Sequence, residues 1–321
     1  LTVEPDVPAF LPPLPQGAPR NRLALARWLV SSENPLTARV IVNRLWQEFF
    51  GKGLVKTSED FGAQGEPPSH PELLDWLASE FRDNGWSVKH LVRLIVTSST
   101  YRQSSIVRRD LLERDPENTL LARQSRLRLP AENIRDAALA AAGLLNTQVG
   151  GPSVRPPQPK GVAELGYANS VKWVDDGGPA RYRRGLYVHF QRTAPYPMLV
   201  NFDAPDSFTS CARRRRSNSP LQALNLLNDP VFFEAAQSLA LRVLREAPPD
   251  QRIDHAFLLA LGRLPSGRER ERMEQFLRQH EAALRARAGQ PQQLLPLDPG
   301  QAAWTSAARA LLNLEEFITR E

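Results

Sequence analysis

Apolar residues recur at helical spacing along most of this chain. Over residues 38–50 they follow the three- and four-residue steps of one helix face, at Ala38, Ile41, Val42, Leu45 and Phe49. Trp46 and Phe50 lie on a second face of the same segment, so we expect this helix to be contacted on two sides. The same spacing predicts further helices over residues 71–83, 88–95, 131–145, 230–243, 253–260, 267–284 and 304–318.

Polar residues at the starts of these segments predict where several helices begin. Ser69–Glu72 and Ser266–Glu269 have the serine and glutamate of a capping box, in which each side chain bonds the other residue's backbone amide. Ser87 precedes another apolar stripe, and Asp229 before Pro230 combines a capping carboxylate with a proline in the first turn. Most of the chain is therefore predicted to be helical.

The middle of the chain has a different pattern. Residues 148–180 are rich in proline and glycine and keep no period, which predicts a long ordered loop or a link. Residues 185–190 alternate and include aromatic side chains, so they predict a strand, and residues 198–202 predict a second short strand. The expected fold class is mainly α, a multi-helix domain with a small β element at about residues 183–203 and long Pro/Gly-rich loops, one of them at 288–300.

These patterns divide the chain into four regions. Residues 1–19 contain six prolines and predict an extended lead-in. The remaining regions are an N-terminal helical region at 20–147, a loop and short-strand insert at 148–218, and a C-terminal helical region at 219–321. We expect residues 20–321 to form one compact domain.

Composition narrows the classes of protein to consider. The 321 residues include 41% hydrophobic positions, as in a folded chain, and no apolar run approaches the roughly 18–20 residues of a membrane helix. Cys211 is the only cysteine, which excludes a disulfide framework, a cysteine-rich zinc site, an iron–sulfur cluster and a CxxCH haem attachment within this segment. The first residue is Leu1 and not Met, so we expect either a processed chain or a part of a longer polypeptide.

The formal net charge of +6 is concentrated in a few places, above all in the run Arg213–Arg216. Such a run can bind phosphate or carboxylate, because each guanidinium offers planar bidentate donors. The competing interpretation is a solvated turn whose arginines pair with nearby acids. Nucleic acid is the less favoured partner, because proteins that bind it usually carry a broader basic stripe.

Few residues are suited to chemistry. None of the five histidines is spaced to pair as metal ligands, so we expect no metal site. The candidate catalytic residues are His70, in the first turn of a helix, and the paired carboxylates Asp203 and Asp206. The competing interpretations are a helix-capping role for His70 and charge pairing of the two acids with the arginine run.

A series of ordered motifs resembles one known family. The motifs are Asn21–Leu29, Asn34–Val40, Asn43–Trp46, Asp60–Gly62, His70–Leu77, Thr100–Ser105, Arg183–Tyr187, Phe202–Asp206, Pro220–Leu224, Leu227–Pro230 and Leu312–Phe317. Together they resemble the domain of unknown function 1553, over about residues 20–319. This family forms the C-terminal part of large exported proteins of planctomycetes and related bacteria, which often carry a cytochrome c module upstream.

The resemblance implies a setting and directs attention to certain polar residues. It implies a periplasmic or cell-surface protein whose haem c belongs to an upstream domain, and whose partners include the upstream domains of the same polypeptide. It implies no activity and no catalytic residues. The polar motif positions that could line a binding site, besides the three candidates above, are Asn43, Arg44, Asp60, Arg102, Arg192 and Arg214.

Three functions follow from these observations, and whether the protein is an enzyme stays open. The first is an accessory or scaffold module of an exported, cytochrome c-associated protein, whose charged networks lock irregular loops. The second is a hydrolase that acts on a polysaccharide or sulfated glycan through a cleft lined by His70, Asp203, Asp206 and arginines. The third is the binding of an anion or nucleic acid through Arg213–Arg216.

Overall fold

The computed structural model describes residues 4–162, 172–287 and 298–320. The chain divides into two compact units, unit 1 over Leu1–Leu127 and unit 2 over Arg128–Arg320. We describe each unit by itself.

Unit 1 is helical. Its helices are α1 (Arg22–Leu29), α2 (Thr37–Phe50), α3 (Pro71–Asp83), α4 (Val88–Thr97) and α5 (Arg109–Arg114). The buried core is built by α2, α3 and α4, whose apolar stripes face one another. The prediction of a helix over residues 38–50 is therefore confirmed.

The buried face of α2 differs in detail from the predicted one. Val42, Trp46 and Phe50 are buried, and the rings of Trp46 and Phe50 stack with their centroids 4.2 Å apart. Leu45 and Phe49 are only partly buried against the same cluster. The buried residues thus come from both predicted faces, Val42 from the first and Trp46 and Phe50 from the second, and the aromatic side chains fill the centre of the unit.

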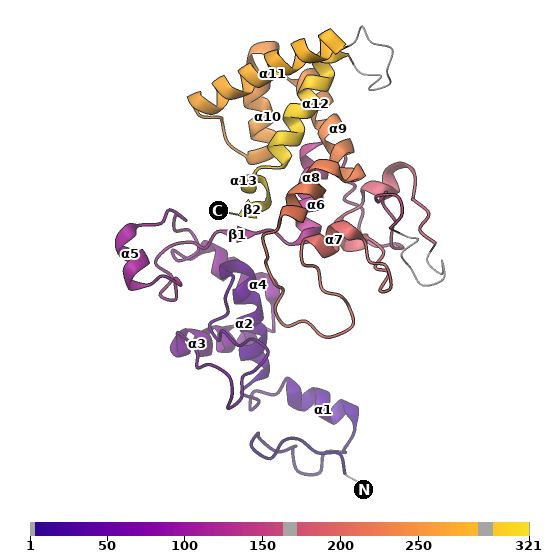
Figure 1. Ribbon diagram of the computed structural model, residues 1–321. Helices are drawn as coiled ribbons and strands as arrows, with labels where there is room; N and C mark the ends of the chain where they lie inside the picture. Colours follow the sequence, from indigo (N-terminus) through magenta and orange to yellow (C-terminus); the bar gives the residue numbers. More distant parts are fainter. Residues whose placement is uncertain (1–3, 163–171, 288–297, 321) are drawn as a thin grey trace. The chain divides into compact units, whose positions relative to one another are not determined.

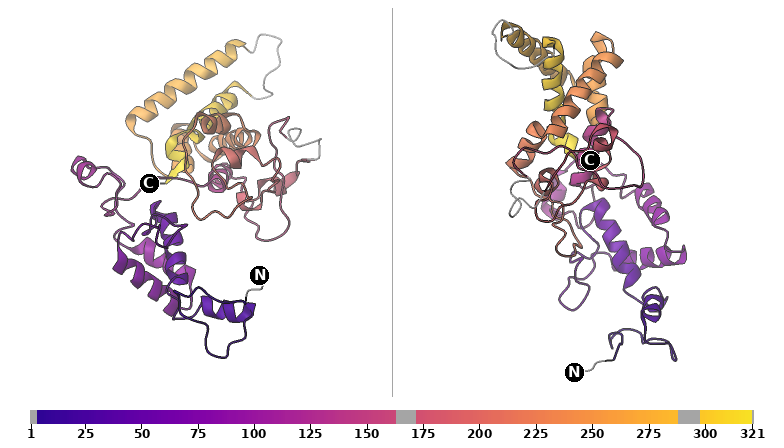
Figure 2. Two further views of the ribbon diagram at one scale, coloured as in Figure 1. Left: turned by 60° about the horizontal axis from the view of Figure 1, so that its bottom comes forward. Right: turned by 90° about the vertical axis from the view of Figure 1, so that its right-hand side faces the viewer.

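Unit 2 contains the remaining elements. They are β1 (Leu127–Arg128), which starts at the unit boundary, α6 (Ala131–Ala141), the 3-10 helices η3 (Gly178–Tyr182) and η4 (Gly185–Tyr187), α7 (Pro197–Asn201), α8 (Pro220–Asn228), α9 (Pro230–Glu246), η5 (Pro249–Gln251), α10 (Arg252–Leu261), α11 (Gly267–Arg287), α12 (Pro299–Leu312), α13 (Glu315–Ile318) and β2 (Thr319–Arg320). Helix α9 packs against α12, α6, α8 and α10, and α11 lies along α12 (Figures 1 and 2). Alanines at Ala138, Ala235 and Ala236 are buried in this core, where small side chains let helices approach closely.

Three of the predicted helix starts are confirmed. The Ser87 side chain accepts a bond from the His90 amide at the start of α4, and Asp229 caps α9 by accepting one from the Val231 amide. At the start of α11, the Ser266 amide and hydroxyl donate to Glu269, whose own amide donates back to Ser266. These caps depend only on residues within three positions of one another, which is why the sequence predicts them.

The capping box predicted at Ser69 is wrong. Helix α3 starts at Pro71 with His70 at the cap position, and no side chain caps it. The Ser69 amide and hydroxyl both donate to the Leu54 carbonyl instead. A tertiary contact therefore holds the serine in place of the local one.

The small β element lies elsewhere than predicted. Residues 185–187 form η4, residues 197–201 form α7, and the two-stranded sheet pairs β1 with β2. In the predicted β element, Arg183 and Val188 make isolated bridges, with Asn146 and Val154 respectively. Gly185 lies so close to α6 that an added Cβ would be 2.7 Å from the Glu132 Cα, so this segment packs on a helix rather than beside a strand.

The prediction of a mainly α fold is confirmed. Within the described residues, none of the helices combines the length and the apolar character needed to cross a bilayer. The loop predicted at 288–300 falls mostly outside the described residues.

Candidate functional site

The predicted site residues lie in both units. Unit 1 contains Asn43, Arg44, Asp60, His70 and Arg102, and unit 2 contains Arg192, Asp203, Asp206 and Arg214.

Asn43 belongs to a buried polar cluster that joins α2 to the chain after it. Its side-chain amide donates to the Val55 carbonyl at 3.0 Å and accepts from the Val55 amide at 2.8 Å. The Ser58 hydroxyl accepts from Asn43 and donates to the Gln47 carbonyl oxygen at 2.7 Å. A Cβ on Gly53 would lie 2.5 Å from the Asn43 side chain, so only glycine fits there. Asn43 thus holds the turn after α2.

This cluster makes a prediction about unit 1. We expect Ser58→Ala to lower the free energy of unfolding by about 1–2 kcal/mol, because the buried bond from the Ser58 hydroxyl to the Gln47 oxygen is lost. Urea denaturation followed by circular dichroism measures the change. Ser32→Ala, at an exposed serine of the same unit, is the control, and an equal loss in both variants would contradict the role of the cluster.

The other candidates of unit 1 have local contacts or are exposed. Asp60 accepts from the Gly62 amide at 2.7 Å, which shapes a turn. His70 lies beside Ser69, with its Nδ1 at 3.0 Å from the serine hydroxyl. Arg44 and Arg102 are exposed.

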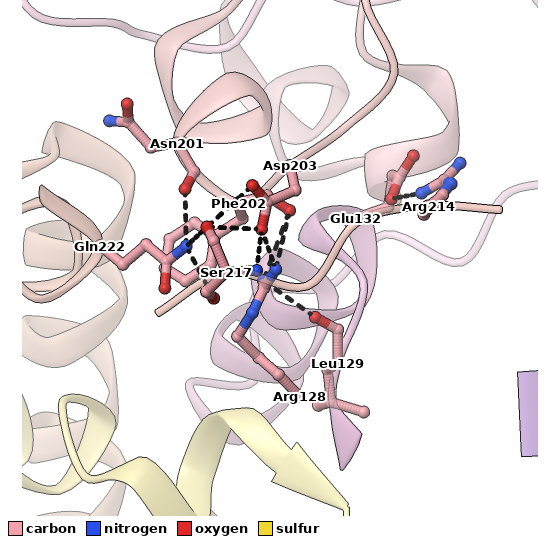
Figure 3. A network of polar contacts seen from close by, with 9 residues as sticks. All are labelled: Arg128, Leu129, Glu132, Asn201, Phe202, Asp203, Arg214, Ser217 and Gln222. Atoms are coloured by element: carbon pink, nitrogen blue, oxygen red, sulfur yellow. Dashed lines mark hydrogen bonds and ion pairs between the residues drawn. The ribbon is translucent and has the colours of Figure 1, made fainter. Parts of the chain in front are cut away.

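In unit 2, Asp203 is the centre of a polar network (Figure 3). It follows α7 with a φ of 62°, a left-handed conformation that aspartate tolerates better than most residues. Its Oδ2 accepts from Arg128 Nη2 at 2.5 Å and from the Ser217 amide at 2.8 Å, and the Ser217 hydroxyl lies 2.9 Å from both carboxylate oxygens. Both oxygens of Asp203 are therefore engaged in holding Arg128 and Ser217.

The network continues from Ser217 into α8. The buried Gln222 side chain donates to the Ser217 carbonyl and hydroxyl and to the Asn201 carbonyl at 2.9 Å. Asn201 lies at the end of α7, so the same amide group joins the ends of two helices (Figure 3). These bonds bring the two ends of the segment 204–216 together and make it a closed loop.

This loop, which we call the arginine loop (residues 204–216), carries Asp206 and Arg213–Arg216. Asp206 is exposed, and within the part of the chain that the structure describes it accepts only a local bond, from the Phe208 amide at 3.0 Å. Arg214 donates to Glu132 in the first turn of α6 at 2.8 Å (Figure 3). Asp203 and Arg214 thus take part in neighbouring contacts, as Figure 3 shows, whereas Arg192 is exposed.

A second network, which the sequence motifs did not predict, surrounds Arg135. This arginine is fully buried on α6 and donates to the carbonyls of Arg183 and Arg181 at 2.5 and 2.6 Å. Burial raises the pKa of the nearby Asp229 to about 6, although the bond from the Val231 amide and the positive charge of Arg135 both act to lower it. A signal was present, because Arg135 lies between Ile134 and Ala138 on the apolar side of the predicted helix.

Arg263 forms a third network at the turn from α10 to α11. Its guanidinium donates to both carboxylate oxygens of Glu269 and of Glu316. The bond from Arg263 is the main reason why the pKa of Glu269 falls to about 2. Like Arg128 and Arg135, Arg263 fixes a connection between elements.

Among the residues that the structure describes, no three histidines, cysteines or carboxylates form a group that could hold a metal ion. Cys211 is exposed, with its Sγ at 3.3 Å from the Arg213 carbonyl. The arrangement can order loops and present arginines to an anion.

Comparison with known proteins identifies the family. No curated protein and no solved structure matches the chain. One family model, PSD1, described as a protein of unknown function (DUF1553), matches residues 21–277, which includes every predicted site residue. The chain therefore belongs to the PSD1 (DUF1553) family.

Proposed function

We propose that this chain is an accessory or scaffold module that holds long irregular loops on a helical body and presents them to other domains of the same polypeptide. The observation that carries the proposal is the bonding of Asp203. Both of its carboxylate oxygens accept hydrogen bonds, from Arg128 and from Ser217, and these bonds close the arginine loop. A general acid or base needs an oxygen that can reach a substrate. The contacts of Asp203 fit a structural role instead.

We place the module in an exported, periplasmic or cell-surface protein, downstream of a cytochrome c module. Membership of the PSD1 family supports this setting through the resemblance described above. Haem c would be bound upstream, because one cysteine cannot supply the two of a CxxCH motif. The complete reading frame tests the setting: we expect an export signal and a CxxCH motif before residue 1, and a frame with neither would contradict it.

The hydrolase hypothesis requires His70, Asp203 and Asp206 to act on one substrate. The contacts described for His70 and Asp206 are local, and no contact among the described residues favours this hypothesis. The hydrolase hypothesis stays a prediction, and so does the hypothesis that the polar motif residues line a binding site.

The structural role of Asp203 can be tested with trypsin, which cleaves after arginine. We expect Asp203→Asn to keep the left-handed backbone, which asparagine also tolerates, but to weaken the charge-assisted bonds from Arg128 and Ser217. Cleavage at Arg213–Arg216 should become about tenfold faster, because it tracks the population of the opened loop. Timed digestion with mass spectrometry of the fragments measures the rate.

Asp206→Asn is the matched control, since Asp206 is an exposed aspartate of the same loop whose side chain accepts a local bond from the Phe208 amide. We expect its cleavage rate to equal that of the wild type. If Asp203→Asn is cleaved no faster than Asp206→Asn, Asp203 does not hold the loop.

A further inference from the structure

The arginine loop presents positive charge on a fixed base. Arg213–Arg216 are exposed, and Asp206 is the only carboxylate of the loop. Arg214 is anchored to Glu132 at 2.8 Å, and the two ends of the loop are tied by Asp203 and Ser217 (Figure 3). The loop can therefore bind a partner without first being ordered, which lowers the entropic cost of binding.

An apolar surface begins directly after this loop. Leu221 and Leu224 lie three residues apart on one face of α8 and are 60% and 53% exposed. The bond from Gln222 to Ser217 places the start of α8 beside the end of the arginine loop. Phe208, within the loop, is 66% exposed. Cationic and apolar side chains thus share one region of unit 2.

We propose that the arginine loop and the outer face of α8 together bind an acidic polypeptide segment that also carries apolar residues. Guanidinium groups match carboxylates with paired hydrogen bonds, and the exposed leucines match an apolar stripe such as that of an amphipathic helix. The inference rests on the proposed scaffold function, for which it names the class of partner.

The same observations favour a polypeptide over a nucleic acid. The run Arg213–Arg216 covers four consecutive positions of one short loop, whereas nucleic-acid binding uses a broad basic stripe that follows the phosphate backbone. A nucleic-acid backbone also leaves Leu221 and Leu224 without a matching apolar surface. A partner with carboxylates and apolar side chains accounts for both features.

The test uses the full chain and three fluorescein-labelled probes. The first is a helical peptide with glutamates on one face and leucines on the other, the second is a peptide of glutamates alone, and the third is a single-stranded oligothymidine. Fluorescence anisotropy at low and at physiological salt measures each Kd. We expect the amphipathic peptide to bind most tightly, and Arg213→Glu with Arg215→Glu to weaken it at least about tenfold.

Two control variants test two points. The first asks whether the position of the arginines matters and not only their charge, and the second asks whether the exposed leucines contribute to binding. Arg268→Glu with Arg272→Glu makes the same change of charge at exposed positions of α11, and we expect Kd to change less than about twofold. Leu221→Ser with Leu224→Ser should weaken the binding of the amphipathic peptide and leave the Kd of the glutamate peptide unchanged. Leu221 and Leu224 are both more than half exposed, so these variants replace no residue of the buried core.

Several outcomes would overturn the inference: no binding of the amphipathic peptide, equal loss in the α11 variant, or tighter binding of the oligothymidine. The last result would assign the loop to nucleic acid. Failure here is distinct from failure of the scaffold proposal, which the trypsin experiment and the reading frame test without any probe.

Discussion

We expect Arg135→Met to lower the free energy of unfolding by about 3–5 kcal/mol, the loss typical of breaking a buried charged network. Arg135 has no exposed surface, and its two terminal nitrogens donate to the carbonyls of Arg183 and Arg181. Methionine fills much of the same space but leaves both carbonyls without these donors and Asp229 without its nearby positive charge. Urea denaturation of the full chain measures the loss.

Two variants control this experiment. Arg135→Lys keeps the charge but has no planar fork to reach two carbonyls, so we expect it to recover only part of the loss. Arg245→Met makes the methionine exchange at an exposed position of α9 and should change stability by less than about 0.5 kcal/mol. If Arg135→Met unfolds at the same urea concentration as Arg245→Met, the buried arginine does not hold the segment 181–183.

Asp229→Asn should stabilise the protein above pH 6 and have little effect near pH 4. Burial raises the pKa of Asp229 from 3.8 to about 6, so between these values the folded state holds a proton that the unfolded state has lost. The stability contributed by this group is present below pH 4 and is lost as pH rises through 6. A shift of about two units corresponds to a gain of at most about 3 kcal/mol for the variant at pH 8.

Asparagine should preserve the cap of α9, since it accepts the Val231 amide as aspartate does. The groups near Asp229 that carry or lose charge are Arg135 of α6 and Tyr196 before α7. Urea titrations from pH 4 to pH 8 give the difference between variant and wild type. Asp298→Asn is the matched control, because Asp298 also caps a helix before a proline but is exposed.

A gain of equal size in Asp298→Asn would contradict the assignment of the effect to the buried carboxylate. A difference in the free energy of unfolding between Asp229→Asn and wild type that stays constant from pH 4 to pH 8 would also contradict this assignment.

The helices were predictable because their signals are local. The apolar stripe of α2 and the cap of α9 each depend on residues within one or two turns. Ser69 is the exception. Its local sequence pattern is that of a capping box, but its hydroxyl and amide donate to the Leu54 carbonyl. A local pattern is reliable only where no tertiary partner competes for the same group.

The site was predictable only in part. The sequence singled out Asp203 and Arg214 as polar motif residues, but it did not reveal their partners. Arg128 is 75 positions from Asp203, and Arg214 is 82 positions from Glu132. No periodicity spans such separations.

By itself, the sequence determined the mainly α class and three of the four helix starts predicted from caps. Its single cysteine also excluded a disulfide framework, a cysteine-rich zinc site and an iron–sulfur cluster within this segment. Tertiary structure decided that residues 185–187 form a turn of helix and that Asp203 closes the arginine loop. It also placed the charge of Arg135 inside unit 2. The physical reason is the separation along the chain of the residues that interact. Helix periodicity and caps depend on residues three or four positions apart. A strand needs a partner strand, and a buried charge needs donors or acceptors from distant parts of the chain.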